Sequence, residues 1–454
     1  MIFAATIVLT GSFAVAQSPV RQDTLLPESV TRLPWVVMEP SAAQMGNTVF
    51  MTGNLFALLS TDAGRTFRHI DPRFAFPEPS GPLCCDQVVV RSSSPEMIFW
   101  YLEYDLDASG SNTVRLARAR GEDDLAAQRW SYWDFTAQAL GFPAGDFLDG
   151  PGLEVGAHDL YVSSNVYRAP DRISEGSVVW RISLSELAAG GAIHWDVARM
   201  PNNRPVKLTS GAGTAMYWAS HDDASHLRVW RWEEGAPAPT SAAVVVAPWP
   251  RLTNGGSCPA PDGNNACGII YDGVTAGWIA NGELGFLWMA GPDARSPYPH
   301  VEALRLSETG YSVASQDRIS SPDAAWIYPA ARVNARGDVG GVIVRAGPSI
   351  FPETRVWIVD RESPSFSSLP TWPTTPGTNG PAANTWGDYL TAAPHPLYPN
   401  AWIGTGYHLE GGTANRFAVG QFLVFGREDA FPQDQPLGPV RPTVPPAPVP
   451  ISGR

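Results

Sequence analysis

The feature that most constrains the fold is a repeated pattern of short strands between Trp35 and Phe425. Each unit reads as an apolar strand, a turn, a second strand and a polar loop, and successive units begin roughly 47–65 residues apart. Segments with helical periodicity are almost absent, and Ser183–Ala189 is one short candidate. Strands at this density predict a sandwich, a barrel or a propeller. The spacing favours the propeller, because a four-stranded blade with loop insertions has about this length.

Seven such units can be placed along the chain. They begin near Glu39, Asp86, Asp149, Thr214, Trp278, Tyr328 and Asp388. We therefore predict an all-β fold, a single propeller over residues 35–425 with seven four-stranded antiparallel blades. Six blades are the alternative, because the fourth and fifth units are poorly marked. In the first unit the strands are predicted at residues 40–44, 48–52, 55–60 and 67–70.

The two ends of the chain lie outside this pattern. Residues 1–16 hold an apolar run that ends in a small-residue cleavage pattern, as a signal peptide does. The run is shorter than the roughly 20 residues that span a bilayer. Residues 17–34 are predicted as an N-terminal extension, and residues 432–454 as a proline-rich disordered tail. We expect an exported protein, secreted or periplasmic, with no membrane span.

Composition narrows the class of partner. The formal net charge is −13, with 31 Lys and Arg against 44 Asp and Glu, whereas a nucleic-acid binder needs a dominant basic footprint. Hydrophobic residues make up 44% of the chain, which excludes wholesale disorder. We expect a monomer that binds a glycan or another extracellular ligand and no nucleic acid.

The four cysteines predict structural disulfides, since export exposes them to an oxidising compartment. Cys258 and Cys267 bracket a polar loop and are predicted to be bridged. The adjacent Cys84 and Cys85 form either a vicinal bridge or a pair of buried thiols, and the sequence does not choose between them. A zinc site is disfavoured, because adjacent cysteines lack the usual ligand spacing.

One motif is more specific than composition. Residues Ser60 to Phe67 (STDAGRTF) match the Asp-box pattern S-x-D-x-G-x-T-[W/F] at every fixed position. In such a hairpin the Asp62 carboxylate is expected to accept backbone N–H groups, and Gly64 permits a positive φ angle. The terminal aromatic is expected to pack between blades. Asp-boxes lie at the blade periphery, so Asp62 is not a catalytic candidate.

With this motif the chain resembles the sialidase superfamily of Asp-box (BNR-repeat) β-propellers, and more particularly the uncharacterised secreted proteins described as sialidase-like. The other stretches that carry the resemblance are Glu39-Pro40-Ser41, Thr52-Gly53-Asn54, Cys84-Cys85-Asp86-Gln87, Trp386-Gly387-Asp388-Tyr389 and Gly404-Thr405-Gly406-Tyr407. For an exo-sialidase the resemblance implies an Arg-Ile-Pro motif, two further carboxylate-binding arginines, a Tyr–Glu nucleophile pair and an acid/base Asp. Arg32-Leu33-Pro34 is a loose match to the first motif, and the other two arginines cannot be assigned.

Candidate catalytic residues follow from propeller topology. Inner strands converge on the central channel, so the residues that begin them are neighbours in space although far apart in sequence. These residues are Glu39, Asp86, Asp149 and Asp388, with Tyr389 beside the last. Acids that converge on one opening raise one another's pKa, recruit a cation, or face hydroxyl-rich ligands. The alternative interpretation is that each acid caps a turn.

Two function classes remain. The first is a carbohydrate-active enzyme that uses paired channel carboxylates: a glycoside hydrolase of the exo-sialidase type or a related polysaccharide-degrading enzyme. A polysaccharide lyase is a variant of this class, with His158, Tyr161 and Tyr167 as candidates for its base. The second class is a non-catalytic propeller that binds glycans or proteins. No cofactor is indicated apart from a structural or channel calcium ion, and no set of metal ligands can be assigned.

Overall fold

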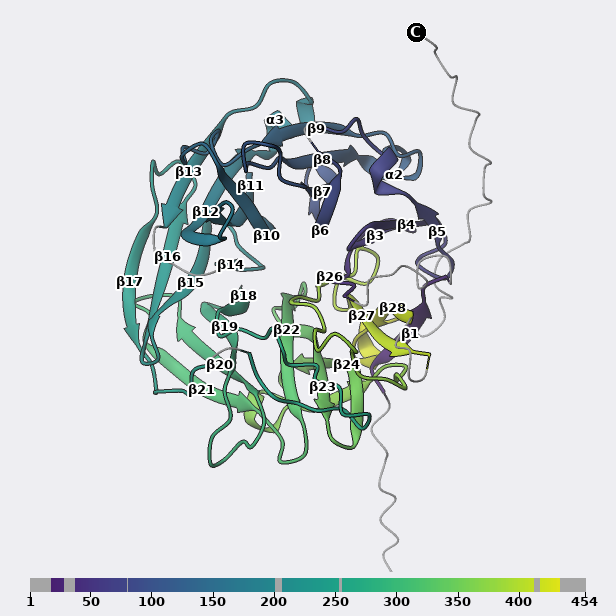
Figure 1. Cartoon of the computed structure of the whole chain (residues 1–454), viewed down its shortest axis with the longest axis vertical. Helices are drawn as coiled ribbons and strands as arrows, with labels where there is room; N and C mark the ends of the chain where they lie inside the picture. Colours follow the sequence, from purple (N-terminus) through teal and green to yellow (C-terminus); the bar gives the residue numbers. More distant parts are fainter. Residues whose placement is uncertain are drawn as a thin grey trace, which may run out of the picture.

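The strands of this chain form seven four-stranded antiparallel sheets, arranged as blades around a central axis (Figure 1). The structure is a computed structural model, and it describes residues 18–27, 37–79, 81–200, 206–252, 255–411 and 417–432. The predicted seven-bladed all-β propeller is confirmed, and the six-bladed alternative is wrong. The predicted signal peptide, Arg32-Leu33-Pro34 and almost all of the C-terminal tail lie outside the described residues.

Within the first six blades, chain order runs from the inner strand to the outer one. Blades 1 and 2 comprise β2 (Ser41–Met45), β3 (Thr48–Gly53), β4 (Phe56–Ser60), β5 (Arg68–Ile70), β6 (Leu83–Ser93), β7 (Glu96–Tyr104), β8 (Val114–Arg120) and β9 (Ser131–Phe135). Blades 3 and 4 comprise β10 (Asp146–Val155), β11 (Asp159–Arg168), β12 (Ile173–Ser183), β13 (Trp195–Met200), β14 (Lys207–Leu208), β15 (Ala215–Asp223), β16 (His226–Glu233) and β17 (Thr240–Val245). Blades 5 and 6 comprise β18 (Val274–Ala280), β19 (Glu283–Ala290), β20 (His300–Ser307), β21 (Val313–Ile319), β22 (Ala325–Val333), β23 (Val339–Gly347), β24 (Ile350–Val359) and β25 (Thr371–Pro373).

Blade 7 joins the two ends of the propeller. It contains β26 (Ala392–Pro394), β27 (Trp402–Glu410) and β28 (Phe417–Phe425), and its outer strand is β1 (Val20–Leu25). β1 pairs antiparallel with β28. Residues 17–34, predicted as an extension ahead of the propeller, therefore contribute a strand to it. Blade 7 is built from both ends of the chain, so the pairing of β1 with β28 closes the ring of blades. The same pairing covers the outer edge of β28, which would otherwise be exposed.

The apolar core lies between neighbouring blades, because each sheet is covered on both faces. β7 shows this in its pattern, since every residue after Glu96 is buried. Tryptophans fill the space between sheets, and the largest fully buried ones are Trp100, Trp180, Trp218, Trp232, Trp288, Trp357, Trp386 and Trp402. These indoles are packing residues, unavailable to stack on a ligand.

All seven predicted unit starts are displaced from the inner strands, by two to seven residues. β6 and β10 begin three residues before Asp86 and Asp149, and β26 begins four residues after Asp388. The inner strand of blade 4 is β14, which has only two residues, whereas the sequence placed the start near Thr214, just before β15. β18 begins four residues before Trp278 and β22 three residues before Tyr328. A two-residue strand shows no alternation of apolar and polar side chains, so its position leaves no periodic signal.

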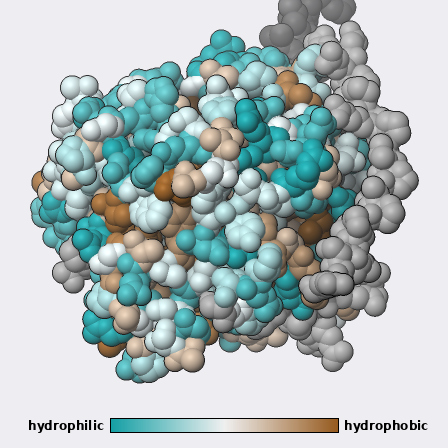
Figure 2. All heavy atoms as spheres, turned by 90° about the horizontal axis from the view of Figure 1, so that it is seen from above, coloured by the Kyte–Doolittle hydropathy of each residue, from teal (hydrophilic) through white to brown (hydrophobic). Residues whose placement is uncertain are grey.

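Helices are short and lie outside the sheets. They are α2 (Gly121–Ala126) and α3 (Leu184–Ala189), with single turns at η1 (Pro72–Phe74), η2 (Phe366–Ser368) and η4 (Glu428–Ala430). The predicted helix at residues 183–189 is confirmed as α3, whose first turn is capped by the Ser183 side chain. None of the helices in the described segments is long and apolar enough to cross a membrane. The face shown in Figure 2 carries mostly hydrophilic side chains with small apolar groups between them.

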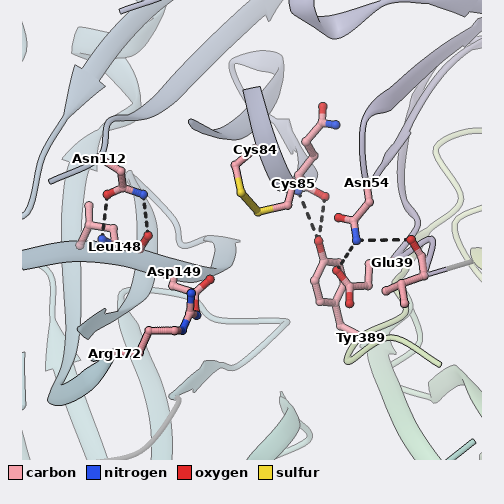
Figure 3. The surroundings of a disulfide bond; sticks show 11 residues. Glu39, Asn54, Cys84, Cys85, Asn112, Leu148, Asp149, Arg172 and Tyr389 are labelled. Atoms are coloured by element: carbon pink, nitrogen blue, oxygen red, sulfur yellow. Dashed lines mark hydrogen bonds and ion pairs between the residues drawn. A yellow bond between two sulfur atoms is a disulfide. The ribbon is translucent and has the colours of Figure 1, made fainter. Parts of the chain in front are cut away.

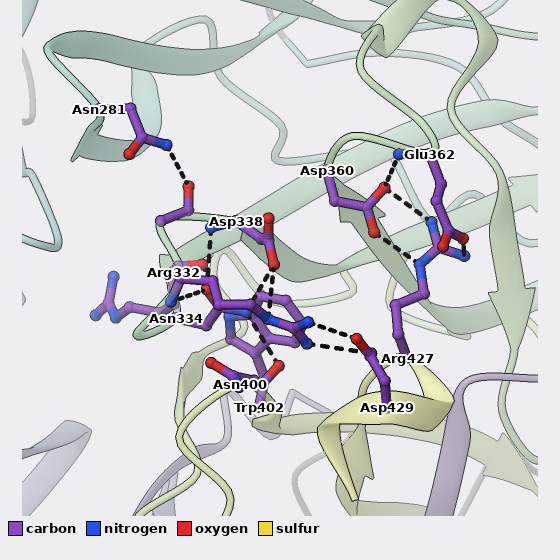
Figure 4. A network of polar contacts seen from close by, with 12 residues as sticks. Asn281, Arg332, Asn334, Asp338, Asp360, Glu362, Asn400, Trp402, Arg427 and Asp429 are labelled. Atoms are coloured by element: carbon purple, nitrogen blue, oxygen red, sulfur yellow. Dashed lines mark hydrogen bonds and ion pairs between the residues drawn. The ribbon is translucent and has the colours of Figure 1, made fainter.

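Polar contacts tie together the loops at the edges of blades 6 and 7 (Figure 4). Arg336 Nη1 lies 2.6 Å from Asp429 Oδ2, and Arg427 Nε lies 2.7 Å from Asp360 Oδ2. The side-chain oxygen of Asn334 accepts the backbone N–H groups of Arg336 and Asp338 at 2.9 and 3.0 Å. Each of these charged or amide groups has a partner, so the blade edges are electrostatically satisfied.

Candidate active site

Irregularities in the inner strands turn acidic side chains toward the channel. In β6 the pairing with β7 jumps from Leu83↔Tyr104 to Gln87↔Leu102, so three residues of β6 face the single residue Glu103. In β10 the pairing with β11 jumps from Asp149↔Asn165 to Gly152↔Ser163. Such bulges bend a strand and re-aim its side chains. Asp86 lies within the bulge of β6 in blade 2. Asp149 lies directly before the bulge of β10 in blade 3.

A cavity of about 410 Å³ opens where these strands converge. Asp86, Asp149, Asp388 and Tyr389, four of the five predicted site residues, line it. The remaining lining residues are Gly150, Pro151, Asn165, Tyr167, Ser174, Gly176, Val206, Lys207, Tyr271 and Val274. The predicted convergence of inner-strand acids on one end of the channel is therefore observed, across blades 2, 3 and 7.

Glu39, the fifth predicted residue, lies directly behind the cavity. Its side chain is 5% exposed, and its Oε1 accepts the backbone N–H of Asp388 at 3.0 Å. Asn54 Nδ2 donates to Glu39 Oε2 at 2.9 Å (Figure 3). The Glu39 carboxyl also influences the pKa of Asp86 and of Asp388. These three acids thus form one electrostatically coupled group, which we call the acid triad.

The environment of the triad favours protonated carboxyls. Burial, followed by the charges of Asp388 and Asp86, raises the pKa of Glu39 well above its ordinary value. Burial and the charges of Asp388 and Asp149 do the same to the pKa of Asp86. Burial and the charge of Asp149 raise the pKa of Asp388 to about 6, against the opposing effect of Lys207. The triad therefore holds protons at weakly acidic pH, and it titrates as a coupled group.

Asp149 differs from the triad because it has a cationic partner. Arg172 Nη2 lies 2.5 Å from Asp149 Oδ2. Burial raises the pKa of Asp149, and the charge and hydrogen bond of Arg172 work against that rise. Carboxylate oxygens of Asp86, Glu103 and Asp149 all lie within 4.8 Å of one another. An acid with a cationic partner and an acid without one therefore stand side by side at the cavity, and burial raises the pKa of both.

Three further charged residues, which the sequence did not single out, lie near the acids: Lys207, Glu154 and Arg332. Lys207, the only lysine of the chain, lines the cavity and lies 5.8 Å from the ring centre of Tyr389. Burial and the nearby Arg332 lower the pKa of Lys207. The buried Glu154 forms an ion pair with Arg332. Lys207 is the first residue of β14, so the rule that located the acids would have found it if that short strand had been recognised.

Tyr389 is oriented by the backbone. Its Oη donates to the carbonyl oxygen of Gln87 and accepts the N–H of Gln87, both at 3.3 Å. Burial and the charges of Asp86 and Glu39 raise the pKa of its phenol well above the ordinary value. A neutral phenol with both hydrogen-bonding directions in use serves as a wall of the cavity.

Both cysteine pairs are bridged, and both lie near the site. The predicted Cys258–Cys267 disulfide is confirmed, and Cys84 and Cys85 form the vicinal bridge. Cys267 pairs with Thr385, three residues before Asp388, so the first disulfide supports the loop that carries Asp388. In Figure 3 the vicinal disulfide lies between the Asp149–Arg172 pair and the group formed by Glu39 and Tyr389.

One group of side chains has the composition of a cation site. It consists of Asp86, Glu103 and Asp149, and one Glu103 oxygen is buried without a hydrogen-bond partner. Burial, together with the charges of Asp149 and Asp86, raises the pKa of Glu103 well above its ordinary value. The guanidinium of Arg172 already supplies positive charge to Asp149 and to Glu103. The charge that a calcium ion would bring is thus partly present in the protein.

The remaining candidates are dispersed. His158 is exposed and pairs through Nδ1 with Glu234 Oε2 at 2.7 Å. Tyr161 is buried against Trp232, with ring centres 6.0 Å apart, whereas Tyr167 lines the cavity from the opposite end of β11. The structure does not bring the three candidates for a lyase base together.

The segment that matches the Asp-box lies at the junction of blades 1 and 7. Asp62 Oδ1 accepts the N–H groups of Arg65 and Thr66 at 3.1 and 2.9 Å, and Gly64 has a φ of +78°. The Phe67 ring packs 5.7 Å from that of Phe422 in β28. Asp62 holds a turn together, as predicted, and is absent from the cavity lining.

The sequence matches no protein-family model and no curated protein. Among solved structures, an alpha-L-arabinofuranosidase from Fusarium graminearum in complex with an iminosugar inhibitor shows 11% identity and a TM-score of 0.44, over 90% of this chain and 98% of its own. An alpha-L-arabinanase from Penicillium chrysogenum complexed with arabinobiose shows 10% identity and a TM-score of 0.43, over 91% and 99%. The NanB sialidase from Streptococcus pneumoniae shows 7% identity and a TM-score of 0.42, over 85% and 82%. Likeness at this level assigns neither an activity nor a substrate to this chain.

Proposed function

We propose that this protein is a glycoside hydrolase whose catalytic carboxyls are Asp149 and the acid triad of Glu39, Asp86 and Asp388. The observation that carries the proposal is that Asp149, paired with Arg172, and Asp86, whose pKa burial raises, lie within 4.8 Å of each other on one cavity. Glycoside hydrolysis needs this pair, one group to donate a proton to the leaving oxygen and one to attack or to activate water. Turn capping accounts neither for the shared cavity nor for the burial of these acids beside one another.

The roles follow from the partners of each group. Asp149, held by Arg172, is the carboxylate that attacks the anomeric carbon. Asp86, within 4.8 Å of it, donates the proton as the glycosidic oxygen leaves, and Glu39 and Asp388 share that proton through the triad. A water molecule then cleaves the glycosyl ester, and Asp86 accepts the proton of the water. Tyr389 shapes the wall of the cavity.

The spacing supports retention of anomeric configuration. Retaining glycosidases hold their two carboxyls about 5–5.5 Å apart, and inverting ones about 6.5–9.5 Å. Carboxylate oxygens of Asp86 and Asp149 lie within 4.8 Å of each other, which is nearer to the retaining spacing than to the inverting one. We therefore propose a covalent glycosyl-enzyme intermediate on Asp149.

The charge of the cavity favours uncharged or cationic sugars. Among the described lining residues Lys207 is the one cation, none is an arginine, and three are acidic. A sialic acid would place its own carboxylate against Asp86, Asp149 and Asp388. We therefore rank a polysaccharide-degrading hydrolase above an exo-sialidase. The acidic cavity and the net charge of −13 also oppose a nucleic-acid ligand.

We propose an exported, monomeric protein. The apolar segment at residues 1–16 supports export, and so do two disulfides in a chain whose four cysteines are all bridged.

The test is a panel of chromogenic glycosides, including a sialoside, assayed from pH 4 to 8 with wild type and Asp149→Asn. We expect wild type to turn over at least one neutral glycoside, and proton NMR to show a product of retained configuration. A product of inverted configuration would contradict the assignment of Asp149 as nucleophile.

A glycan array run in parallel addresses the non-catalytic alternative. Tight glycan binding by wild type without turnover of that glycan, and with equal binding by Asp149→Asn, would overturn the enzymatic proposal. Turnover of the sialoside alone would replace the neutral-sugar assignment with an exo-sialidase.

A further inference from the structure

The vicinal disulfide Cys84–Cys85 occupies an unusual place, since it lies inside the bulge of β6. The residues that face Glu103 are Cys84, Cys85 and Asp86, so the bridge spans the two positions directly before the acid. A disulfide between adjacent residues closes a small ring through their shared peptide bond. The backbone torsions that aim Asp86 are therefore fixed covalently at that point.

The two ends of the bulge are anchored by other contacts. On one side Leu83 is buried and pairs with Tyr104. On the other side Gln87 is fully buried: its Nε2 donates to the Gly53 carbonyl at 2.6 Å, and its Oε1 accepts from Trp100 Nε1 at 3.0 Å. Only the segment between these anchors can vary its path, and the disulfide takes up most of that segment.

The sulfur atoms also adjoin Glu103, the residue that faces the bulge and lies beside the catalytic carboxyls. Both Sγ atoms and a Glu103 oxygen lie within 4.8 Å of one another, and Glu103 in turn lies within 4.8 Å of Asp86 and Asp149. The bridge thus adjoins Glu103, and in Figure 3 it lies between the Asp149–Arg172 pair and Tyr389. It helps to exclude water from that side of Glu103, which is 4% exposed.

We propose that the Cys84–Cys85 disulfide is a positioning element for the proton donor, because it fixes the bulge that presents Asp86 to Asp149. This inference rests on the proposed function for its effect on catalysis. The stability of the propeller does not depend on the bridge, since it closes no loop and joins no two blades. Its loss lowers kcat more than it changes KM, because the substrate still enters a cavity whose other walls are unchanged.

The first experiment compares wild type with Cys84→Ser/Cys85→Ser by amide hydrogen exchange, thermal unfolding and, on a glycoside that wild type cleaves, steady-state kinetics. We expect faster exchange confined to residues 83–88, a Tm within about 2 °C of wild type, and a kcat lower by about 10- to 100-fold, the range in which a misplaced proton donor falls. The alkaline limb of the pH profile is expected to move, because the surroundings of Asp86 change.

Reduction supplies a reversible version of the same comparison. In the Cys258→Ser/Cys267→Ser background only the vicinal bridge remains, and a phosphine reductant converts it to two thiols by transferring two electrons, with two protons from water. That variant in its oxidised form is the reference. We expect kcat to fall on reduction and to return on reoxidation.

The outcomes separate this inference from the proposed function. If wild type cleaves no glycoside but exchange at residues 83–88 rises in the variant, the positioning role stands and the hydrolase proposal fails. Unchanged exchange in the bulge overturns the positioning role whatever the activity. A large loss of Tm, with faster exchange across blade 2, also overturns it, because the bridge would then be a general support of the blade.

Discussion

Two aspartates of this propeller show what distinguishes a structural acid from a chemical one. Asp62, at the junction of blades 1 and 7, accepts four hydrogen bonds, two from backbone N–H groups and two from hydroxyls of Ser60 and Thr66. Burial would raise the pKa of Asp62, but these donors outweigh it and the pKa is lowered. Asp388, at the channel, shares its environment with other acids, and its pKa is raised to about 6. The difference lies in the neighbours, since the residue type is the same.

The contrast extends to whole regions. At the blade edges the acids have cationic or N–H partners, as the Arg336–Asp429 and Arg427–Asp360 pairs do. At the channel, Glu39, Asp86, Glu103 and Asp388 all have a raised pKa, and burial is the largest cause for each. Acids that are buried together with few hydrogen-bond donors or cations beside them lower the stability of the fold at neutral pH. Such a cluster of destabilising groups is typical of a functional site.

The largest effect is expected from Asp149→Asn. An amide can neither attack the anomeric carbon nor carry negative charge, so kcat should fall by about 10³-fold or more while Tm changes little. The matched control is Asp196→Asn, because Asp196 forms an ion pair with Arg181 at 2.8 Å on the outer part of the same blade. The control should keep wild-type activity. Equal losses of kcat in both variants would contradict the distinction between catalytic acids at the channel and structural acids at the blade edges.

Arg172→Met tests the cation that keeps Asp149 ionised. Without the guanidinium the pKa of Asp149 should rise further. The acidic limb of the pH–activity profile should therefore lie at a higher pH than in wild type. We expect this limb to move up by about 1 pH unit and kcat to fall by about 10-fold. Arg345→Met, which removes the partner of Asp323 at 2.9 Å, is the control at a blade edge. An acidic limb that stays in place would show that Arg172 does not act on Asp149.

Lys207→Met should give a smaller shift on the other side of the profile. Lys207 lowers the pKa of both Asp86 and Asp388, so removing its charge should let the triad keep its protons to higher pH. The alkaline limb should move up by about 0.5 pH unit, with little change in the maximal kcat. A shift toward lower pH would contradict the placement of Lys207 among these acids.

Much of this arrangement could be predicted from the sequence, and the limits have physical causes. Strand spacing predicted the blade count, and the rule that inner strands share an opening predicted that Asp86, Asp149 and Asp388 would meet. The same rule failed for Lys207, because β14 is too short to show a strand pattern. Glu103 was missed because it lies near the end of β7, the second strand of its blade, and comes to the site opposite the bulge of β6. The position of a bulge depends on how two strands pair, and this pairing cannot be read from the sequence of either strand alone.

The closure of the ring was missed for a similar reason. β1 is short, partly exposed and separated from its partner β28 by nearly the whole chain, so no local pattern joins them. The Asp-box turn was predicted well because the hydrogen bonds that the Asp62 carboxylate accepts all come from residues within four positions of it.

The most direct test measures activity and stability together in Asp388→Asn and Asp62→Asn. Because the folded-state pKa of Asp388 lies above the unfolded value of about 3.9, its contribution to stability is lost as pH rises from about 4 to about 6. Asp388→Asn should therefore raise the free energy of unfolding at pH 7.5 by about 1–3 kcal/mol while lowering kcat by about 100-fold or more.

Asp62 has a lowered pKa, so its contribution to stability is present at pH 7.5 and is lost in acid. Asp62→Asn should lower stability by about 1 kcal/mol and leave kcat unchanged. The central claim is contradicted if Asp388→Asn keeps full activity on a glycoside that wild type cleaves, or if it destabilises the protein at pH 7.5 as Asp62→Asn does.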